Sequence, residues 1–279
     1  MRASKCRPPR QLPWLFFCAL LLSSLLLTPS VQAIPVKPKT RSQISLEEVA
    51  VMLSSSSEDE VRTALETAAT LPARDIVAML DERVRSGLSR ELLDVAIDSL
   101  LLLDDKTASP LLVDLAQHRR PEVRVRALEV MGRLKSSNLE SVLLRGLSDV
   151  TPEVRKAAAD ALAESGARGS IPTLFKAFER GVEPAGVALG RLAKPEDLTR
   201  LLDYVGKLAL DTVTPMVVAL LGRRDLSEAD KLRALNKVTT LAGDDATSGA
   251  ETLLAQLPSD ASPRLRRALT DAVEKGKAP

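Results

Sequence analysis

Residues 151–162 read TPEVRKAAADAL, and residues 120–131, which begin 31 positions earlier, read RPEVRVRALEVM. In both stretches the apolar side chains recur at positions i, i+3, i+4 and i+7, which is the pattern of an amphipathic helix. A helix start that recurs at a fixed interval indicates an internal repeat, and a repeat of this length is typical of stacked helical units.

The apolar positions of this helix can be followed through three copies of the repeat. Four of its five columns stay apolar when the sequence is shifted by 31 residues in either direction. The three sets are Val123, Ala127, Leu128, Met131 and Leu134; Leu92, Ala96, Ile97, Leu100 and Leu103; and Val154, Ala158, Ala159, Leu162 and Ser165. The helix before it follows the same step, from Leu112, Val113 and Ala116 to Leu143, Leu144 and Leu147 and then to Leu174, Phe175 and Phe178.

The start of the repeated helix has its own signature. Thr151 is expected to be an N-cap that accepts backbone N–H groups, Pro152 suits the first helical position, and Glu153 favours the positive helix end. Ser109 and Ser262, each followed by proline, are expected to repeat this arrangement.

These patterns predict an all-α fold, an α-solenoid (superhelix) of antiparallel helix pairs with a period of about 31 residues. One pair cannot bury its own apolar stripe, whereas stacked pairs share a continuous core. The predicted repeat domain covers residues 45–275. Its pattern weakens at 182–222, where VEPAGVALGRLAKP predicts a short second helix and a change of curvature.

The segment LSDVTPEVRKAAADALAESGARGSIPTL, residues 147–174, resembles a HEAT repeat of the short type first associated with phycobilisome lyases. The positions that carry the resemblance are Asp149, Val154, Arg155, Ala158 and Leu162. The resemblance implies that Asp149 and Arg155 brace neighbouring repeats, and Asp260 and Arg266 have the same six-residue spacing. His118 occupies the aspartate position before Arg124, which departs from the family pattern.

The N-terminal residues have the composition of a secretory signal peptide. Residues 1–33 combine a basic start, the 14-residue run WLFFCALLLSSLLL and a V-x-A end, which predicts cleavage after Ala33 and export to the periplasm or outside the cell. The alternative is an uncleaved membrane anchor, although 14 residues span only about 21 Å. Residues 34–44 are expected to form a flexible linker, and residues 276–279 a disordered tail.

Removal of the signal peptide changes the charge and the composition. Residues 1–33 contain four of the 39 Lys and Arg residues and none of the 37 Asp and Glu residues, so the remainder carries a net charge of −2 (35 − 37). That charge argues against nucleic acid as a partner. Both cysteines are also lost, and no stable membrane insertion is expected after cleavage.

The sequence offers little equipment for catalysis. His118 is the one histidine of the chain, and metal sites and serine-type relays need more imidazoles or thiols. The acidic pairs Asp104–Asp105 and Asp244–Asp245 fall in predicted loops, where adjacent carboxylates point apart. We therefore expect no catalytic residues, no bound metal and no cofactor.

Two classes of function remain. The first is an exported scaffold or adaptor, without catalytic activity, that binds a partner protein on the solenoid surface. Its candidate binding residues lie opposite the buried stripe: Glu122, Arg126, Glu129, Arg133, Glu153, Lys156, Asp160 and Glu164. The alternative is an enzyme or a lyase-like enzyme subunit with a carboxylate site in the irregular region 182–222.

Export can be tested on the protein itself. N-terminal sequencing of the protein purified from its native compartment is expected to give Ile34 as the first residue. A sequence that begins at Met1 in a membrane fraction would instead show that residues 1–33 remain as an anchor.

Overall fold

The computed structural model describes residues 44–135 and 137–277, and these residues form fifteen α-helices and four short 3-10 helices. The predicted signal peptide 1–33 and all of the linker 34–44 except Ile44 lie outside the described residues. The α-helices are α1 (Leu46–Leu53), α2 (Glu58–Ala68), α3 (Ala73–Ser86), α4 (Arg90–Leu103), α5 (Ser109–Leu115), α6 (Pro121–Leu134), α7 (Glu140–Gly146), α8 (Pro152–Ser165), α9 (Ile171–Glu179), α10 (Glu183–Leu192), α11 (Leu198–Leu202), α12 (Leu210–Leu221), α13 (Glu228–Thr239), α14 (Asp244–Ala255) and α15 (Pro263–Lys277). The 3-10 helices are η1 (Lys106–Ala108), η2 (Ser137–Leu139), η3 (Arg168–Ser170) and η4 (Pro195–Asp197).

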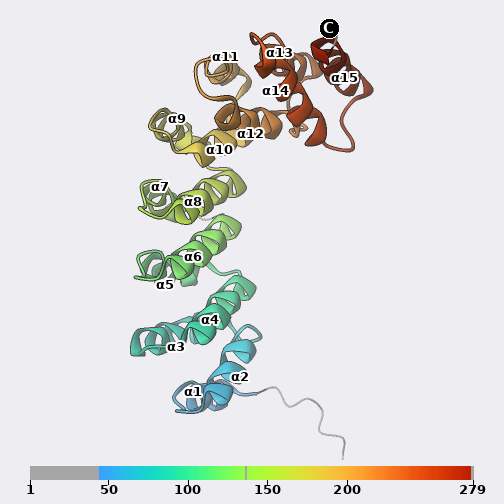
Figure 1. Cartoon of the computed structure of the whole chain (residues 1–279). Helices are drawn as coiled ribbons and strands as arrows, with labels where there is room; N and C mark the ends of the chain where they lie inside the picture. The colour runs from blue at the N-terminus through green and yellow to red at the C-terminus, as the bar shows by residue number, and fades with distance from the viewer. Residues whose placement is uncertain (1–43, 136, 278–279) are drawn as a thin grey trace, which may run out of the picture. The chain divides into compact units, whose positions relative to one another are not determined.

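The helices pair in chain order and the pairs stack on one another (Figure 1). The even-numbered helices form one layer, in which α2, α4, α6, α8, α10, α12 and α14 each pack against the next. The odd-numbered helices α1, α3, α5, α7 and α9 each pack against the even-numbered helix that follows them. This arrangement confirms the predicted all-α solenoid of antiparallel helix pairs.

The core is the predicted apolar stripe. The four positions of the repeat that stay apolar in all three copies are buried in α4, α6 and α8. The first of them is Leu92 in α4, Val123 in α6 and Val154 in α8. The fifth column is buried only in the middle copy, since Leu134 is buried whereas Leu103 and Ser165 are half-buried. Each repeat therefore covers the apolar stripe of its neighbour along one face of the even-numbered helices.

Small residues set the distance between the central helices. A Cβ atom added to Gly132 on α6 would lie 2.7 Å from the Cα atom of Ala161 on α8, and one added to Gly146 would lie 2.8 Å from the Cβ atom of Ala158. Real Cβ atoms do not approach so closely, so glycine is needed at both places for α8 to pack against α6 and α7. Close approach brings more atoms into van der Waals contact.

The predicted helix caps are confirmed in part. Pro152 occupies the start of α8, and the Ser262 hydroxyl accepts the N–H of Leu265 at 3.3 Å. Thr151 is the N-cap of α8, as predicted, but the expected cap hydrogen bond is wrong, because its hydroxyl instead accepts one from Arg124 at 3.3 Å. The prediction for Ser109 is also wrong, because this residue is the first of α5 and follows Ala108 as the N-cap.

The irregular region contains the short helices α10 and α11 and the helix α12, which has a proline inside it. A Cβ atom added to Gly190 of α10 would lie 2.5 Å from the carbonyl oxygen of Met216 on α12, so these helices also pack through glycine. Pro215 lies inside α12, where it removes one backbone donor. A single bridge, Val205–Leu208, is the only β-type pairing within the described residues.

The buried guanidinium of Arg223 joins the loop after α12 to the end of α10. Its Nη1 donates to the carbonyl oxygens of Gly190, at 3.3 Å, and Ala193, at the end of α10. Its Nε and Nη2 bind Asp225 at 3.0 and 2.8 Å, and these hydrogen bonds lower the pKa of Asp225 to about 2. Arg223 thus supplies partners for carbonyl groups that a helix end leaves unpaired.

At the C-terminus, α15 runs to Lys277, so Gly276 and Lys277 are helical rather than part of the disordered tail predicted for 276–279. Residues 278–279 lie outside the described residues. None of the helices between Ile44 and Lys277 is both long enough and apolar enough to cross a membrane.

The stripe assignment can be tested by a matched pair of substitutions on α8. Leu162 is fully buried and Glu164 is exposed. We expect Leu162→Asp to lower the free energy of unfolding by roughly 3–5 kcal/mol, because it buries an unpaired charge. Glu164→Lys should leave it nearly unchanged. Thermal and urea unfolding followed by circular dichroism measures both, and equal stability of the two variants would contradict the assignment.

Candidate binding groove

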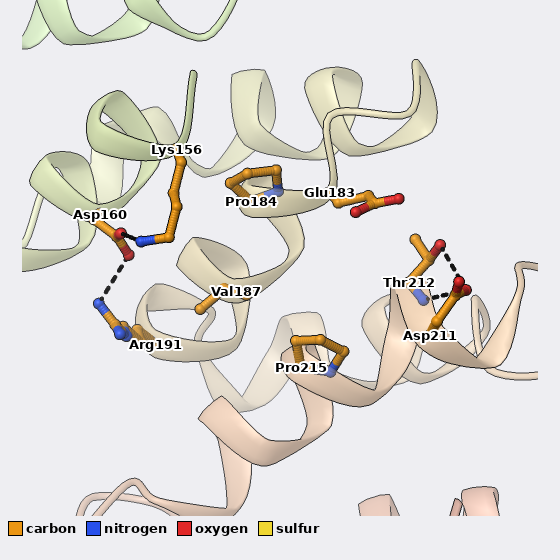
Figure 2. A pocket seen from close by; sticks show the side chains of 9 residues that line it. All are labelled: Lys156, Asp160, Glu183, Pro184, Val187, Arg191, Asp211, Thr212 and Pro215. Carbon is orange, nitrogen blue, oxygen red and sulfur yellow. Dashed lines mark hydrogen bonds and ion pairs between the residues drawn. The ribbon is translucent and has the colours of Figure 1, made fainter. Parts of the chain in front are cut away.

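A hollow of about 550 Å³ lies on the face of the even-numbered helices, between α8, α10 and α12 (Figure 2). It is lined by nine residues: Lys156, Asp160, Glu183, Pro184, Val187, Arg191, Asp211, Thr212 and Pro215. Figure 2 shows Asp160 between Lys156 and Arg191 on one side of the hollow, with Glu183 and Asp211 on the other side. Proline and valine side chains lie between the charged groups.

This hollow continues in both directions. Toward α4 it shares Lys156, Glu183 and Pro184 with a hollow of about 360 Å³, which in turn shares Glu153 with one of about 630 Å³. Toward α14 it shares Asp211 and Pro215 with a hollow of about 530 Å³. The four hollows follow one another along α4, α6, α8, α10, α12 and α14, and we call this row of hollows the groove. The further residues that line it are Arg90, Asp94, Pro121, Glu122, Val125, Arg126, Thr151, Pro152, Arg155, Gly181, Val182, Leu210, Thr214, Ser248, Thr252 and Gln256.

Ion pairs cross the groove from one helix to the next. The Asp160 carboxylate accepts the Lys156 ammonium at 2.6 Å within α8 and the Arg191 guanidinium of α10 at 3.3 Å. Arg126 of α6 pairs with Glu129 at 2.7 Å and also with Asp98 of α4. These pairs are partly exposed, and each contributes little to stability.

A second set of charges in the groove has no such partner. Glu122, Glu153, Glu183 and Asp211 lie in the first turns of α6, α8, α10 and α12. None of the four makes an ion pair within the described part of the chain. The sequence places acids there because a carboxylate is favoured beside the positive end of a helix.

The eight predicted binding residues all lie on α6 and α8, which are neighbours in the stack. Five of them line the groove: Glu122, Arg126, Glu153, Lys156 and Asp160. The other three, Glu129, Arg133 and Glu164, lie on the same helices but outside the groove lining. Helical spacing alone places a residue on the polar side of its helix and does not show where neighbouring helices create a hollow.

The residues that α10 and α12 contribute to the groove were missed by the sequence analysis. Glu183 and Asp211 repeat the first-turn acids of α6 and α8, and this signal was available in the sequence. The loss of the 31-residue register after residue 182 hid the correspondence. The region 182–222 does contain two carboxylates beside a hollow, Glu183 and Asp211, and both are exposed. The third carboxylate of this hollow, Asp160 of α8, already forms ion pairs with two cations.

The brace between repeats is present, with a different arginine from the one expected. The Asp149 carboxylate accepts two hydrogen bonds from Arg124 of the preceding repeat, at 2.8 and 2.9 Å, and one from the Thr151 N–H at 2.9 Å. Burial alone would raise the pKa of Asp149, but the hydrogen bonds from Arg124 and Thr151 outweigh it, and the pKa is lowered. Arg155 instead donates to the carbonyl oxygens of Asp149 and Val150, at 2.9 and 3.1 Å.

His118 takes part in this brace through its backbone. Its carbonyl oxygen accepts Nη1 of Arg124 at 2.9 Å, so the departure from the family pattern leaves this contact intact. The imidazole Nδ1 accepts the N–H of Arg120 at 3.1 Å. Burial, followed by the charges of Arg119 and Arg120, lowers the pKa of His118.

The second predicted brace is looser. Arg266 donates to the carbonyl oxygen of Pro258 at 3.3 Å, and Asp260 pairs at 3.6 Å with Arg224 of the loop between α12 and α13. The Arg224 and Asp260 side chains are 93% and 69% exposed, so this ion pair adds little to stability.

An aromatic cluster not foreseen from the sequence joins α9 to α11. The Tyr204 ring packs edge-on against Phe178, with centroids 5.2 Å apart, and its hydroxyl donates to Glu179 at 2.6 Å. Arg200 lies 4.0 Å above the Phe175 ring and binds Glu179 at 3.1 Å. The hydrogen bonds from Tyr204 and Arg200 lower the pKa of Glu179. The cluster stabilises α11, which is too short to be stable alone.

The match to a family model agrees with the repeat pattern. Residues 109–185, from α5 into α10, match the family model described as HEAT repeats, so this part of the chain consists of HEAT repeats and the resemblance is confirmed. No curated protein matches the chain. One solved structure similar to it is the complex of CpcE and CpcF of phycocyanin lyase from Nostoc sp. PCC7120, with 17% identity, a TM-score of 0.45, and coverage of 89% of this chain and 100% of the matched chain.

The brace gives a test with a matched control. We expect Asp149→Ala to lower the free energy of unfolding by about 1.5–3 kcal/mol at pH 7, because Arg124 is left largely buried without its carboxylate. Asp260→Ala should have little effect, because its ion pair is exposed.

The first effect should depend on pH in a defined direction. The lowered pKa of Asp149 means that its contribution is complete above the unfolded-state pKa of about 3.9 and is lost as the pH falls toward the folded-state pKa. The difference between wild type and Asp149→Ala should therefore shrink between pH 5 and pH 3 in urea unfolding experiments. A difference that is constant with pH would contradict the assigned role of the carboxylate.

Proposed function

We propose that this protein, which contains HEAT repeats, is an exported scaffold or adaptor without catalytic activity that binds a partner protein in the groove along α4–α14. The observation that carries the proposal is the row of neighbouring hollows on successive repeats, which share the lining residues Glu153, Lys156, Glu183, Asp211 and Pro215. A groove that crosses six helices suits an elongated partner better than a small molecule, because small-molecule sites enclose most of the ligand in one cavity.

The groove also has the mixed surface of a protein interface. Apolar side chains such as Val125, Val187 and Pro215 alternate with charged groups, some of which are already held by ion pairs. Preorganised side chains lose less conformational entropy when a partner binds. The groove belongs to the even-numbered helices, whose packing is the most continuous in the structure, so it is supported by a rigid layer.

An enzyme or enzyme subunit remains the second candidate. The observation in its favour is the presence of Asp160, Glu183 and Asp211 around one hollow in the region where the repeat is irregular. The scaffold is favoured because acid–base catalysis relies on carboxylates held in a protected environment, whereas Glu183 and Asp211 are exposed. Export to the periplasm or outside the cell is part of the proposal and rests on the composition of residues 1–33.

Site-specific cross-linking tests the proposal in the native compartment. A photoreactive amino acid at Glu183, on the groove, is expected to give a discrete cross-linked product with a partner protein. The same amino acid at Glu164, on α8 but outside the groove, should give none. Val187→Arg should reduce the yield at position 183 about tenfold, since it fills the hollow. Absence of any groove-specific product, or equal products at both positions, would overturn the proposal.

A further inference from the structure

The groove acids that make no ion pair form a row with the period of the repeat. One of them, Asp211, accepts hydrogen bonds from the N–H and the hydroxyl of its neighbour Thr212, at 2.8 and 3.4 Å. Glu122, Glu153, Glu183 and Asp211 follow one another at intervals of 31, 30 and 28 residues (153 − 122, 183 − 153, 211 − 183). Each lies in the first turn of one even-numbered helix, and each lines the groove. The row therefore places one carboxylate on each of four successive helices.

The cations of the groove, in contrast, are mostly satisfied. Lys156 and Arg191 share Asp160, and Arg126 is held by Asp98 and Glu129. Arg155 donates to two backbone carbonyl oxygens. Among the groove residues that the structure describes, Arg90 is the one cation without a hydrogen-bond or ion-pair partner. Asp94, an acid on the same helix, also has no such partner. The charge that the groove leaves for a ligand is negative.

The helix ends do not cancel this charge. A helix N-terminus carries the equivalent of about half a positive charge, whereas a carboxylate carries a full negative one. The N–H groups of the first turn would by themselves favour an anionic ligand. With an acid in each first turn, the local field has the opposite sign, so phosphate groups and acidic segments are disfavoured.

The spacing expected for this row is that of an extended polypeptide. Packed helices lie about 8–10 Å apart, so we expect a similar distance between first-turn carboxylates on successive helices. Three residues of an extended chain cover about 9–10 Å, because polyproline II advances about 3.1 Å per residue and a strand about 3.3 Å. Side chains at every third position of such a chain therefore have about the same spacing as the acids.

We propose that the groove binds an extended, basic segment of its partner protein, with Lys or Arg at every third position facing Glu122, Glu153, Glu183 and Asp211. This inference rests on the proposed function and gives the chemistry of the partner. The cations bind the first-turn carboxylates, and the residues between them contact the apolar surface of Val125, Pro184, Val187 and Pro215. Because the ion pairs are exposed, binding weakens as the salt concentration rises.

Peptide binding to the full chain tests the register. The probe is a fluorescent ten-residue peptide with lysine at positions 1, 4, 7 and 10 and serine and proline between them. A second peptide of the same composition has its four lysines in one block, and a third has glutamate in place of lysine. Fluorescence anisotropy at about 50 mM salt should show binding of the spaced peptide, several-fold weaker binding of the block peptide, and no binding of the acidic peptide.

Substitutions locate the binding. The groove variant carries Glu122→Gln, Glu153→Gln, Glu183→Gln and Asp211→Asn, and it should bind the spaced peptide about tenfold or more weakly, since each exposed ion pair contributes a factor of about two to five. The control variant has the same change of net charge outside the groove: Glu66→Gln, Glu82→Gln, Glu164→Gln and Asp203→Asn. It should bind as the wild type does. Circular dichroism of both variants shows whether the fold is retained.

Several results would overturn the inference. One is equal affinity of the spaced and block peptides, and another is tighter binding of the acidic peptide than of the spaced peptide. A third is equal weakening of peptide binding by the groove and control variants. A fourth is a concentration-dependent dimer in sedimentation experiments that the spaced peptide does not dissociate. The failure of the proposed function is a separate result. Cross-linking at Glu183 without binding of the spaced peptide would support the scaffold function and contradict the basic segment. Binding of the spaced peptide without any cross-link to a natural protein would contradict the scaffold function, although the groove would still bind basic segments.

Discussion

The packing of each even-numbered helix against the next is the interaction on which the rest of the structure depends. A single helix pair buries only part of its apolar surface, so the stripe that runs through Val123, Val154 and their equivalents is covered only when neighbouring pairs stack. Between α6 and α8 the helices meet through Gly132 and Ala161, and the Arg124–Asp149 ion pair joins the same repeats at their loops. Apolar contact supplies most of the stability, and the ion pair fixes the register.

The groove follows from this stacking. Because each even-numbered helix begins at the same edge of the layer, the residues of its first turn lie beside those of the next helix. A feature that stabilises one helix, an acid at its positive end, thus becomes a row of carboxylates along the surface. The first-turn acids that stabilise the helices are therefore the same residues that line the groove, both within the clear repeats and after the register is lost.

Much of the fold could be predicted from the sequence, because the buried stripe is encoded by a period of 31 residues that survives in α4, α6 and α8. The groove could be predicted only in part. Glu122 and Glu153 lie within the clear repeats, whereas Glu183 and Asp211 follow the loss of register near Gly181. The resemblance implied that Asp149 and Arg155 brace neighbouring repeats without naming their partners, and the structure pairs Asp149 with Arg124 of the preceding repeat. Contacts between repeats depend on three-dimensional stacking, which local spacing does not specify.

Backbone hydrogen exchange, measured by mass spectrometry on the full chain, tests the stacked layer most directly. Helices that are packed on both sides open least often, so amides of α6 and α8 should exchange most slowly, with rates that rise toward α1 and α15. Exchange in α6 and α8 as fast as in the terminal helices would contradict the account, because it would show that the helices do not protect one another through a shared core.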